Sequence, residues 1–408
     1  MSRIDDLIRR YAPDGVEYIE LAELFSTRNG YTPPKSDASA WADGTVPWFR
    51  MEDIREKGRV LDDSIQHIAT TAVKGGRLFP ANSIIVATSA TIGEHALISV
   101  PHLSNQRFTS LALKPKYQDR FEIKFIFYYC FVLDEWCKNN TTVSSFASVD
   151  MVGLKKFKFP APPLEVQRDI VRILDAFTEL EAELEAELEA RKQQYAHYRD
   201  ALLSFGGSEA VSWATLSELC TIQSGGTPKS DNAVYYGGDI PWCAISDITS
   251  ASKYIRRTQR TITPEGLANS SAKVFDAGTL LLSIYASLGE VTITSIPMAT
   301  NQAILGLVPR DGSGILVDYL YYTMLSSKDR LLAQRQVGSQ NNLNKAIVAD
   351  FRVPVPAMPD QERIVALLDK FDALVNDLSS GLPAEIEARR QQYAHYRDRL
   401  LSFEELTV

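Results

Sequence analysis

The side chains in this sequence that could recognise another molecule are basic and amide-bearing residues in its polar, turn-rich segments. These candidates are Lys35, Arg50, Gln106, Arg107, Lys229, Lys253, Arg256, Arg257, Arg260, Gln340, Asn341 and Asn342. Lysine and arginine pair with phosphates, and the forked ends of Arg, Asn and Gln match the edges of DNA bases. Any one of them is compatible with an ordinary solvated surface. As a set they favour contact with a nucleic acid.

Sequence motifs for catalysis are absent. The chain contains no GxxxxGK[ST] loop, no G-x-G-x-x-G, no H-E-x-x-H and no G-x-S-x-G. Its cysteines form no C-x-x-C pair and its histidines no H-x-x-x-H pair, so the sequence predicts neither a disulfide framework nor a metal site. A nuclease-like group could be assembled from Asp360, Glu362 and Lys370, next to Pro359. Their place in the first turns of a helix-forming segment favours solvated surface charges instead.

Two tryptophans and two histidines are each compatible with two roles. Trp48 and Trp242 both follow a proline, and their indoles could stack on a base, but a position at the entry of a strand favours burial in a core. His197 and His395 occupy equivalent places in two helix-forming segments. They could bind a ligand, although packing beside a helix seam is the simpler interpretation.

Length and composition indicate a globular chain of two or three domains. Of its 408 residues, 45% are hydrophobic and 23% are charged. The apolar stretches around 83–93 and 279–289 are short and run into Glu94 and Glu290. A secretion signal or a membrane span is therefore not expected, and a reducing cytoplasm fits the cysteine usage.

The net charge of −8 is unevenly distributed. Segments 164–205 and 360–405 carry −5 and −4, whereas the remaining residues have 32 basic against 31 acidic side chains. Net acidity taken alone argues against DNA binding. Because the acidity is confined to two segments, the rest of the chain is not repelled by phosphate.

The chain is a tandem duplication. ARKQQYAHYRDALLSF at 190–205 returns as ARRQQYAHYRDRLLSF at 388–403, with 14 of 16 positions identical. Further pairs keep the same order, including VPWFRMEDI with IPWCAISDI and PAPPLEVQRDIVRILDAF with PVPAMPDQERIVALLDKF. Two copies of this length imply a pseudo-twofold arrangement rather than a solenoid. The match of VEYIELAELF with VSWATLSELC extends the repeat towards the N-terminus and suggests a chain that closes on itself.

Each copy consists of a globular part followed by a charged, helix-forming part. Short β-branched runs separated by Gly, Pro and Asn predict mixed α/β domains with long loops, and helices at 121–138 and 316–336. The predicted fold class is α+β, with two similar mixed α/β domains separated by two long antiparallel coiled-coil helices. The predicted boundaries are 1–158 and 206–352 for the domains and 159–205 and 353–408 for the helical segments.

The helical segments carry apolar residues at alternating steps of three and four, as a coiled-coil seam requires. A stutter follows Leu184, and Gly381 and Pro383 predict a break of the second helix near 379–383. We expect the two helices to pack antiparallel, and replacing Phe177 or Phe371 by alanine should cost about 3–5 kcal/mol if their rings are fully buried. The residues predicted to make the helix–helix contact are Ile170, Phe177, Leu184, Tyr195, Leu202, Ile364, Phe371, Leu378, Tyr393 and Leu400.

These repeats resemble the specificity (S) subunits of type I restriction–modification enzymes. PAPPLEVQRDIV and PVPAMPDQERIV, each leading into R[KR]QQYAHYRD-x-LLSF, are similar to the two helical regions of that family, and the preceding domains to its target-recognition domains. The segment GSQNNLN at 338–344 resembles the end of such a domain. The first copy departs from this pattern, with TTVSSFASVD in the corresponding place.

The resemblance implies a non-catalytic subunit that selects a bipartite, asymmetric sequence in double-stranded DNA. Each domain would read one half-site, and the helices would set the spacing and dock two methyltransferase subunits. S-adenosylmethionine is then expected on those partners and no cofactor on this chain, with motor–nuclease subunits completing the enzyme. Two alternatives remain open: a coiled-coil scaffold that does not bind DNA, and a self-contained DNA methyltransferase or nuclease.

Overall fold

The computed structural model describes residues 13–142, 147–205, 211–334, 342–376 and 380–406. Its internal contacts divide the chain into unit 1, Met1–Glu181 with Arg389–Val408, and unit 2, Ala182–Ala388. Each unit therefore combines one globular domain with parts of two helical segments. The predicted division into four consecutive segments differs from this one, because the helices pack onto the domains as well as onto each other.

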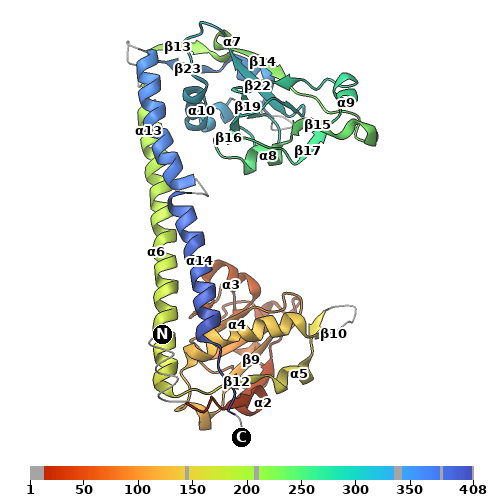
Figure 1. Cartoon of the computed structure of the whole chain (residues 1–408). Coiled ribbons are helices and arrows are strands. Elements are labelled where there is room, and N and C mark those ends of the chain that lie inside the picture. The colour runs from red at the N-terminus through yellow and green to blue at the C-terminus, as the bar shows by residue number, and fades with distance from the viewer. Residues whose placement is uncertain (1–12, 143–146, 206–210, 335–341, 377–379, 407–408) are drawn as a thin grey trace. The chain divides into compact units, whose positions relative to one another are not determined.

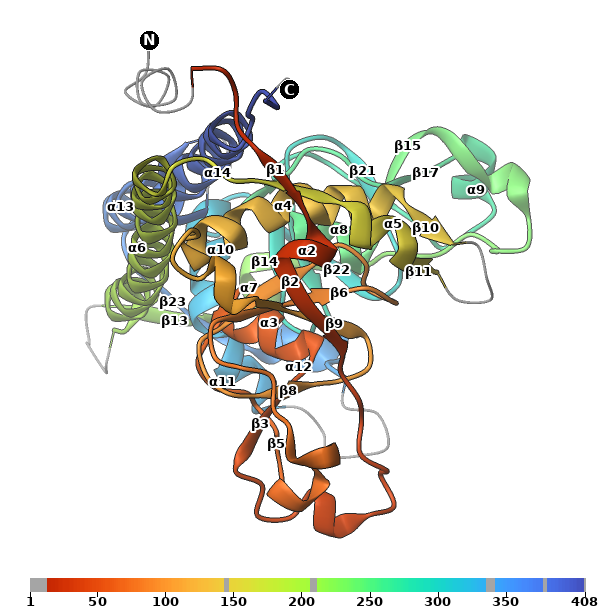
Figure 2. The ribbon, with the colours of Figure 1, turned by 90° about the horizontal axis from the view of Figure 1, so that it is seen from below.

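The domain of unit 1 is built on two small sheets. The five-stranded sheet has the order β2-β9-β6-β7-β4, with β2 (Phe25–Asn29), β9 (Phe108–Leu113), β6 (Ser83–Ala87), β7 (His95–Ile98) and β4 (Val60–Leu61). All its pairs are antiparallel except β4 with β7. The second sheet has the order β5-β3-β8, with β5 (His67–Ile68), β3 (Val46–Phe49) and β8 (Leu103–Ser104). In Figure 2 these three strands lie on the other side of the larger sheet from α4 (Ile123–Asn139).

Helix α4 covers the larger sheet and supplies much of the core. Its sequence is apolar around most of its circumference, and Phe125, Ile126 and Cys130 are fully buried with Ile84 of β6. Such a helix is stable only when it is covered on several sides. Figure 1 shows α4 between the sheet and the C-terminal part of α14 (Gly381–Leu400). The smaller elements of the domain are β1 (Tyr18–Glu20), α2 (Leu21–Leu24), α3 (Met51–Lys57), β10 (Thr141–Thr142), β11 (Ser148–Val149), α5 (Met151–Lys156) and β12 (Lys158–Pro160).

Unit 2 repeats this topology, which confirms the predicted duplication. Its five-stranded sheet has the order β14-β22-β19-β20-β16, with β14 (Cys220–Ser224), β22 (Ile304–Pro309), β19 (Leu280–Ser283), β20 (Val291–Thr294) and β16 (Tyr254–Ile255). The second sheet, β17-β15-β21-β18, contains β17 (Arg260–Ile262), β15 (Tyr236–Cys243), β21 (Met298–Thr300) and β18 (Val274–Phe275). The remaining elements are β13 (Ser212–Thr215), α7 (Leu216–Leu219), α8 (Ile245–Ser250), α9 (Pro264–Ala268), α10 (Val317–Ser326), α11 (Lys328–Leu332), α12 (Lys345–Asp350) and β23 (Arg352–Val355).

Three long helices follow from the helix-forming segments. The first segment forms α6 (Leu164–Leu203), and the second forms α13 (Met358–Asn376) and α14. Gly381 begins α14 with φ +73°, and a Cβ there would lie 2.6 Å from the carbonyl oxygen of Leu374. Only glycine adopts this conformation at low cost. The second helical segment is therefore interrupted where the glycine and proline predict it.

The helices pack antiparallel in both units. In unit 1, Phe177 stacks on Tyr396 with ring centroids 5.6 Å apart, and Glu181 pairs with Arg390 at 2.6 Å. In unit 2, Tyr198 stacks on Phe371 at 6.0 Å, and the Tyr195 hydroxyl lies 3.4 Å from Asp372. Within unit 1, a later position on α6 contacts an earlier position on α14. The predicted antiparallel pairing is confirmed by this direction.

The predicted seam is only partly a helix–helix seam. Ile170 and Ile364 are buried in the large core clusters of their own units, among residues of the globular domains. Phe177 and Phe371 are half-buried, so the condition of full burial, under which alanine would cost about 3–5 kcal/mol, is not met. Each apolar stripe is thus shared between the partner helix and the adjoining domain. Of the other predicted contacts, Tyr195 and Leu400 are buried, Leu378 lies outside the described residues, and the half-buried ones are Leu184, Leu202 and Tyr393.

Two buried glutamines attach the helices to the domains. Gln167 of α6 accepts a hydrogen bond from the Glu122 amide at 2.9 Å and donates to the carbonyls of Arg120 and Pro162. Gln361 of α13 makes the same three kinds of bond in unit 2, to the Leu316 amide and the carbonyls of Gly314 and Pro356. Both side chains are completely buried. The start of each helix is thus fixed to the loop that precedes α4 or α10.

The C-terminal segment joins the first strand of unit 1. The Val16 amide donates to the Glu404 carbonyl at 2.8 Å, and the Leu406 amide donates to the Val16 carbonyl at 3.0 Å. The Tyr18 hydroxyl also donates to the Phe403 carbonyl at 3.1 Å. The two ends of the described chain therefore close unit 1 together. Within the described residues, none of the helices has the length and apolarity needed to cross a membrane.

Candidate nucleic-acid interface

Two equivalent loops carry the candidate lysines Lys35 and Lys229. Each loop begins at a glycine that approaches the backbone closely: a Cβ on Gly30 would lie 2.1 Å from the Asn105 carbonyl oxygen, and one on Gly225 would lie 2.4 Å from the Asn301 carbonyl oxygen. No other residue fits such a contact. Both lysines are exposed at the start of the Lys-Ser-Asp sequence.

The glutamines after β8 and β21 hold these loops in place. The Thr32 hydroxyl donates to the side-chain oxygen of Gln106, and Thr227 makes the same bond to Gln302. Gln106 is exposed, and its neighbour Arg107 is exposed as well. The candidates Lys35, Gln106 and Arg107 therefore belong to two neighbouring loops of unit 1.

The two tryptophans belong to the core. Trp48 and Trp242 are both 4% exposed. Their indole N–H groups donate to the carbonyls of Tyr31 at 2.9 Å and Gly226 at 3.1 Å. The interpretation as core residues is confirmed, because an indole with its donor engaged and its ring buried is not available to stack on a base.

Two buried aspartates shape the loops between the sheets. Asp53 accepts from the amides of Arg50 and Ile65, both at 2.6 Å. Asp247 accepts from the amides of Ala244 at 2.8 Å and Gln259 at 2.9 Å. The sequence analysis missed these two residues, although both copies have an aspartate at the same place in VPWFRMEDI and IPWCAISDI. They fix the segments 62–66 and 256–259, which connect β4 to β5 and β16 to β17.

Three exposed arginines of unit 2 lie in the second of these segments or directly after it, at the start of β17. Arg256, Arg257 and Arg260 are all exposed. The guanidinium of Arg260 lies over the rings of Tyr236 at 4.7 Å and Trp242 at 5.2 Å. An arginine stacked on aromatic rings is held in a defined direction while its donors stay in solvent.

Four other candidate DNA contacts are less exposed than these arginines or lie outside the described residues. They are Arg50, Gln340, Asn341 and Asn342. The Arg50 side chain is 29% exposed, its Nε is buried, and its nearest carboxylate is Glu52 at 3.9 Å. Asn342 is half-buried beside a hollow of about 560 Å³ in unit 2. Gln340 and Asn341 lie outside the described residues.

Lys253 is not a surface residue, which corrects its assignment as a candidate DNA contact. Only 5% of it is exposed. Its ammonium pairs with Asp318 of α10 at 2.7 Å and with Asp369 of α13. The Tyr322 hydroxyl donates to the same Asp369 oxygen at 2.5 Å. Lys253 therefore joins the domain of unit 2 to α13.

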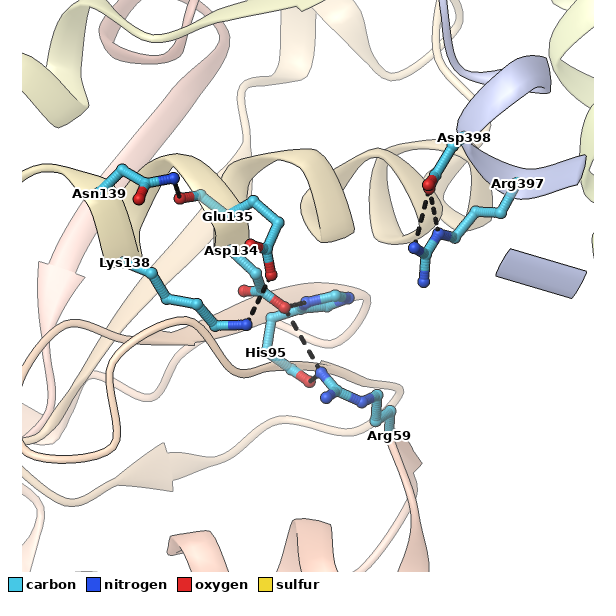
Figure 3. A network of polar contacts seen from close by, with 8 residues as sticks. All are labelled: Arg59, His95, Asp134, Glu135, Lys138, Asn139, Arg397 and Asp398. Carbon is cyan, nitrogen blue, oxygen red and sulfur yellow. Dashed lines mark hydrogen bonds and ion pairs between the residues drawn. The ribbon is translucent and has the colours of Figure 1, made fainter. Parts of the chain in front are cut away.

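The equivalent position in unit 1 is Arg59, whose side chain also makes contacts within its own unit. Its carbonyl accepts from the Leu97 amide at 2.8 Å, as the Lys253 carbonyl accepts from Ile293. Its guanidinium lies 3.5 Å from the carboxylate of Asp134, which also binds Nδ1 of the buried His95 at 2.7 Å. Both contacts are drawn in Figure 3. The charge of Arg59 is thus engaged within unit 1.

The cysteines are not suited to nucleophilic chemistry. All four are buried and unpaired. Burial raises the pKa of the thiols of Cys137, Cys220 and Cys243 to about 12 and that of Cys130 well above its ordinary value. A buried, protonated thiol is inert. Among the described residues, no group of three or more His, Cys, Asp or Glu side chains could hold a metal ion.

Comparison with known proteins assigns the family. A sequence profile described as the type I restriction modification DNA specificity domain matches residues 13–190 and again 210–388. The chain belongs to the type I restriction–modification specificity family. The specificity subunit of the Escherichia coli type I restriction enzyme EcoprrI is 41% identical over 376 residues, which cover 89% of each chain. The Escherichia coli EcoR124I/EcoR124II specificity subunit is 36% identical over 65% of this chain and 69% of its own.

Solved structures of type I systems share the fold. A chain from a study of complex assembly and conformational transition of the type I R-M system gives a TM-score of 0.69 at 17% identity, covering 95% of this chain and 98% of that one. The HsdS subunit from Thermoanaerobacter tengcongensis gives 0.50 at 18% identity, covering 95% and 97%. In this specificity-family chain the exposed cations described above lie in polar loops, apart from Arg260 at the start of β17.

Proposed function

We propose that this chain is the DNA-specificity subunit of a type I restriction–modification enzyme. Its two domains read the two halves of a bipartite, asymmetric sequence in double-stranded DNA. The observation that carries the proposal is one framework present twice with different loops. The bonds of Asp53 and Asp247, and those of Gln106 and Gln302, are the same in both units, whereas the exposed loop residues differ. Equal frameworks with unequal loops suit two readers of different sequences.

The helices supply a surface for protein partners and a fixed length. The segments 164–205 and 360–405 are acidic, so they do not attract phosphate and are suited to protein contacts. We assign them to docking of two methyltransferase subunits, with the motor–nuclease subunits joining through that complex. S-adenosylmethionine belongs to the methyltransferase subunits, and this chain catalyses no reaction itself. A cytoplasmic location follows from these partners and from the unpaired cysteines.

The domains can be tested separately by exchange. Replacing residues 211–352 with the corresponding domain of another specificity subunit should change one half of the recognised sequence and leave the other half intact. The readout is the set of adenines methylated by the reconstituted methyltransferase complex. A simultaneous change in both halves would contradict independent reading.

The same assay tests the two alternative classes. Methylation of DNA by the purified chain with S-adenosylmethionine alone would show a self-contained enzyme. The scaffold alternative would be supported if no sequence preference were found, either in selection from random duplexes or in the reconstituted complex.

A further inference from the structure

The hydrogen bonds shared by the two units give a residue-by-residue correspondence between their loops. Strand register makes Arg28 equivalent to Gln223, since Arg28 pairs with Ser110 of β9 and Gln223 with Gly306 of β22. The turn in which the Asn105 side chain accepts from Arg107 is matched by Asn301 and Ala303. The exposed charges of the units can therefore be compared position by position.

Unit 1 gathers arginines and lysines beside β2. Arg28 donates to the Arg77 carbonyl at 2.8 Å, and its guanidinium lies 4.3 Å from the centroid of the Phe79 ring. The Lys74 ammonium lies 4.9 Å from the Tyr31 ring, and the Lys74 amide donates to the Tyr31 hydroxyl at 2.8 Å. Arg107 directly precedes Phe108, whose carbonyl accepts from the amide of Gly30, the residue after β2, at 2.9 Å. We call Arg28, Lys74, Arg77 and Arg107 the β2 patch.

The β2 patch has no internal counter-charge. No carboxylate of the described chain forms an ion pair with any of its four members. Burial lowers the pKa of Arg28 from its ordinary value, and the nearby charge of Arg77 lowers it further. Like charges held together without a carboxylate are stabilised by an external anion.

Unit 2 lacks this patch. The positions equivalent to Arg28, Lys74 and Arg107 are Gln223, Ser270 and Ala303. Of the four equivalent positions, only Lys273, in place of Arg77, keeps a positive charge.

The loop between β16 and β17 shows the opposite distribution. In unit 2 this loop carries Arg256 and Arg257, and Arg260 follows it as the first residue of β17. The bonds of the two buried aspartates align it with the unit 1 loop, since Asp53 accepts from Ile65 and Asp247 from Gln259. The unit 1 residues at the same three positions are Asp62, Asp63 and Gln66. Two carboxylates at this place repel phosphate, whereas the arginines of unit 2 attract it.

We propose that the two domains bind the DNA backbone with different parts of the same framework: unit 1 with the β2 patch, and unit 2 with the β16–β17 loop. The proposal rests on the proposed function, because it concerns how the two half-sites are held. The ligand groups are backbone phosphates. These contacts position each domain, and base reading is left to other loop residues.

Substitutions that remove positive charge from one unit at a time test this assignment. In full-length protein, Arg28→Gln with Arg107→Ala gives unit 1 the residues that unit 2 has. Arg256→Ser with Arg257→Ser removes two charges from unit 2. Gln223→Ala in unit 2 and Gln66→Ala in unit 1 are the matched controls, each placed where the other unit has its cation. All six positions are outside the hydrophobic cores, so every variant should keep a cooperative urea unfolding transition.

Binding is measured on a duplex that contains the recognised sequence, over a range of salt concentrations. Each double variant should reduce the slope of log K against log salt by about one to two, with the same loss of affinity for every sequence. Hydroxyl-radical footprints should lose backbone protection in one half-site for the unit 1 variant and in the other half-site for the unit 2 variant. The controls should keep the wild-type slope and footprint.

Three results would overturn the inference. These are an unchanged slope in either double variant, loss of protection in the same half-site for both, or a changed base preference in place of a uniform loss. Failure of the proposed function gives a different result, since the wild-type protein would then select no bipartite sequence at all.

Discussion

Replacing Gln361 by methionine isolates the contribution of the buried glutamine contacts. Methionine keeps the length and most of the volume of the side chain but makes none of its hydrogen bonds. The Leu316 amide at 2.9 Å and the carbonyls of Gly314 at 2.7 Å and Pro356 at 2.9 Å lose their partner. The bond to Pro356 is fully buried, and the other two are partly reached by solvent.

The expected loss of stability follows from this difference in burial. A fully buried carbonyl without a partner costs about 2 kcal/mol, and each partly buried group costs about 1 kcal/mol. The sum is about 4 kcal/mol in the free energy of unfolding of unit 2, which lowers its Tm by roughly 8–16 °C for a unit of this size. The Gln167→Met variant should destabilise unit 1 by a similar amount, because its three bonds are of the same kind.

Urea unfolding and hydrogen exchange together measure the effect. Exchange at the Leu316 amide should accelerate in Gln361→Met and remain unchanged in Gln167→Met, with the converse at the Glu122 amide. The exposed neighbour Glu362 provides the control, since Glu362→Ala should alter neither quantity. A loss below about 1 kcal/mol with the Leu316 amide still protected would refute the reasoning, because water or a rearranged loop would then replace the glutamine.

Three further predictions concern burial, charge and length. Burial lowers the pKa of His102 to about 4, so the unfolded chain takes up a proton first as pH falls below 6.5, and stability is lost between pH 6.5 and 4. The variant His102→Met should abolish roughly 2–3 kcal/mol of this loss, measured by urea unfolding at pH 4.5 and at pH 7. An identical pH dependence in wild type and variant would contradict this prediction. Lys253→Met should lower the free energy of unfolding by about 2–3 kcal/mol, less than the loss of a fully enclosed ion pair, because the Asp369 side chain is 46% exposed. The control Arg256→Met should leave the free energy of unfolding unchanged. Equal stabilities of these two variants would count against the structural role of Lys253. Inserting four helical residues after Leu188 adds about 6 Å to α6 and should lengthen the gap between half-sites by one or two base pairs without changing either half; methylated sites with the wild-type gap would show that the helix does not set the spacing.

The sequence by itself determined the duplication, the antiparallel helices and the interruption at Gly381. These features depend on local signals. Apolar residues at steps of three and four specify a helix stripe, a glycine followed by a proline ends it, and 14 identical positions out of 16 reveal the repeat. The helix at Ile123–Asn139 and the strands at β6, β19 and β20 follow from similarly local patterns.

Tertiary structure decided which surface each helix residue faces and which charges are free. Lys253 and Arg256 are three residues apart and equally polar in the sequence, yet one is buried between two carboxylates and the other is exposed. The carboxylates that pair with Lys253 belong to Asp318 of α10 and Asp369 of α13, about 65 and 116 positions further along the chain. Likewise, Ile170 belongs to a domain core rather than to a helix seam because residues distant in sequence cover it. Burial depends on these long-range contacts, and periodicity shows only that a residue is covered, not which element covers it.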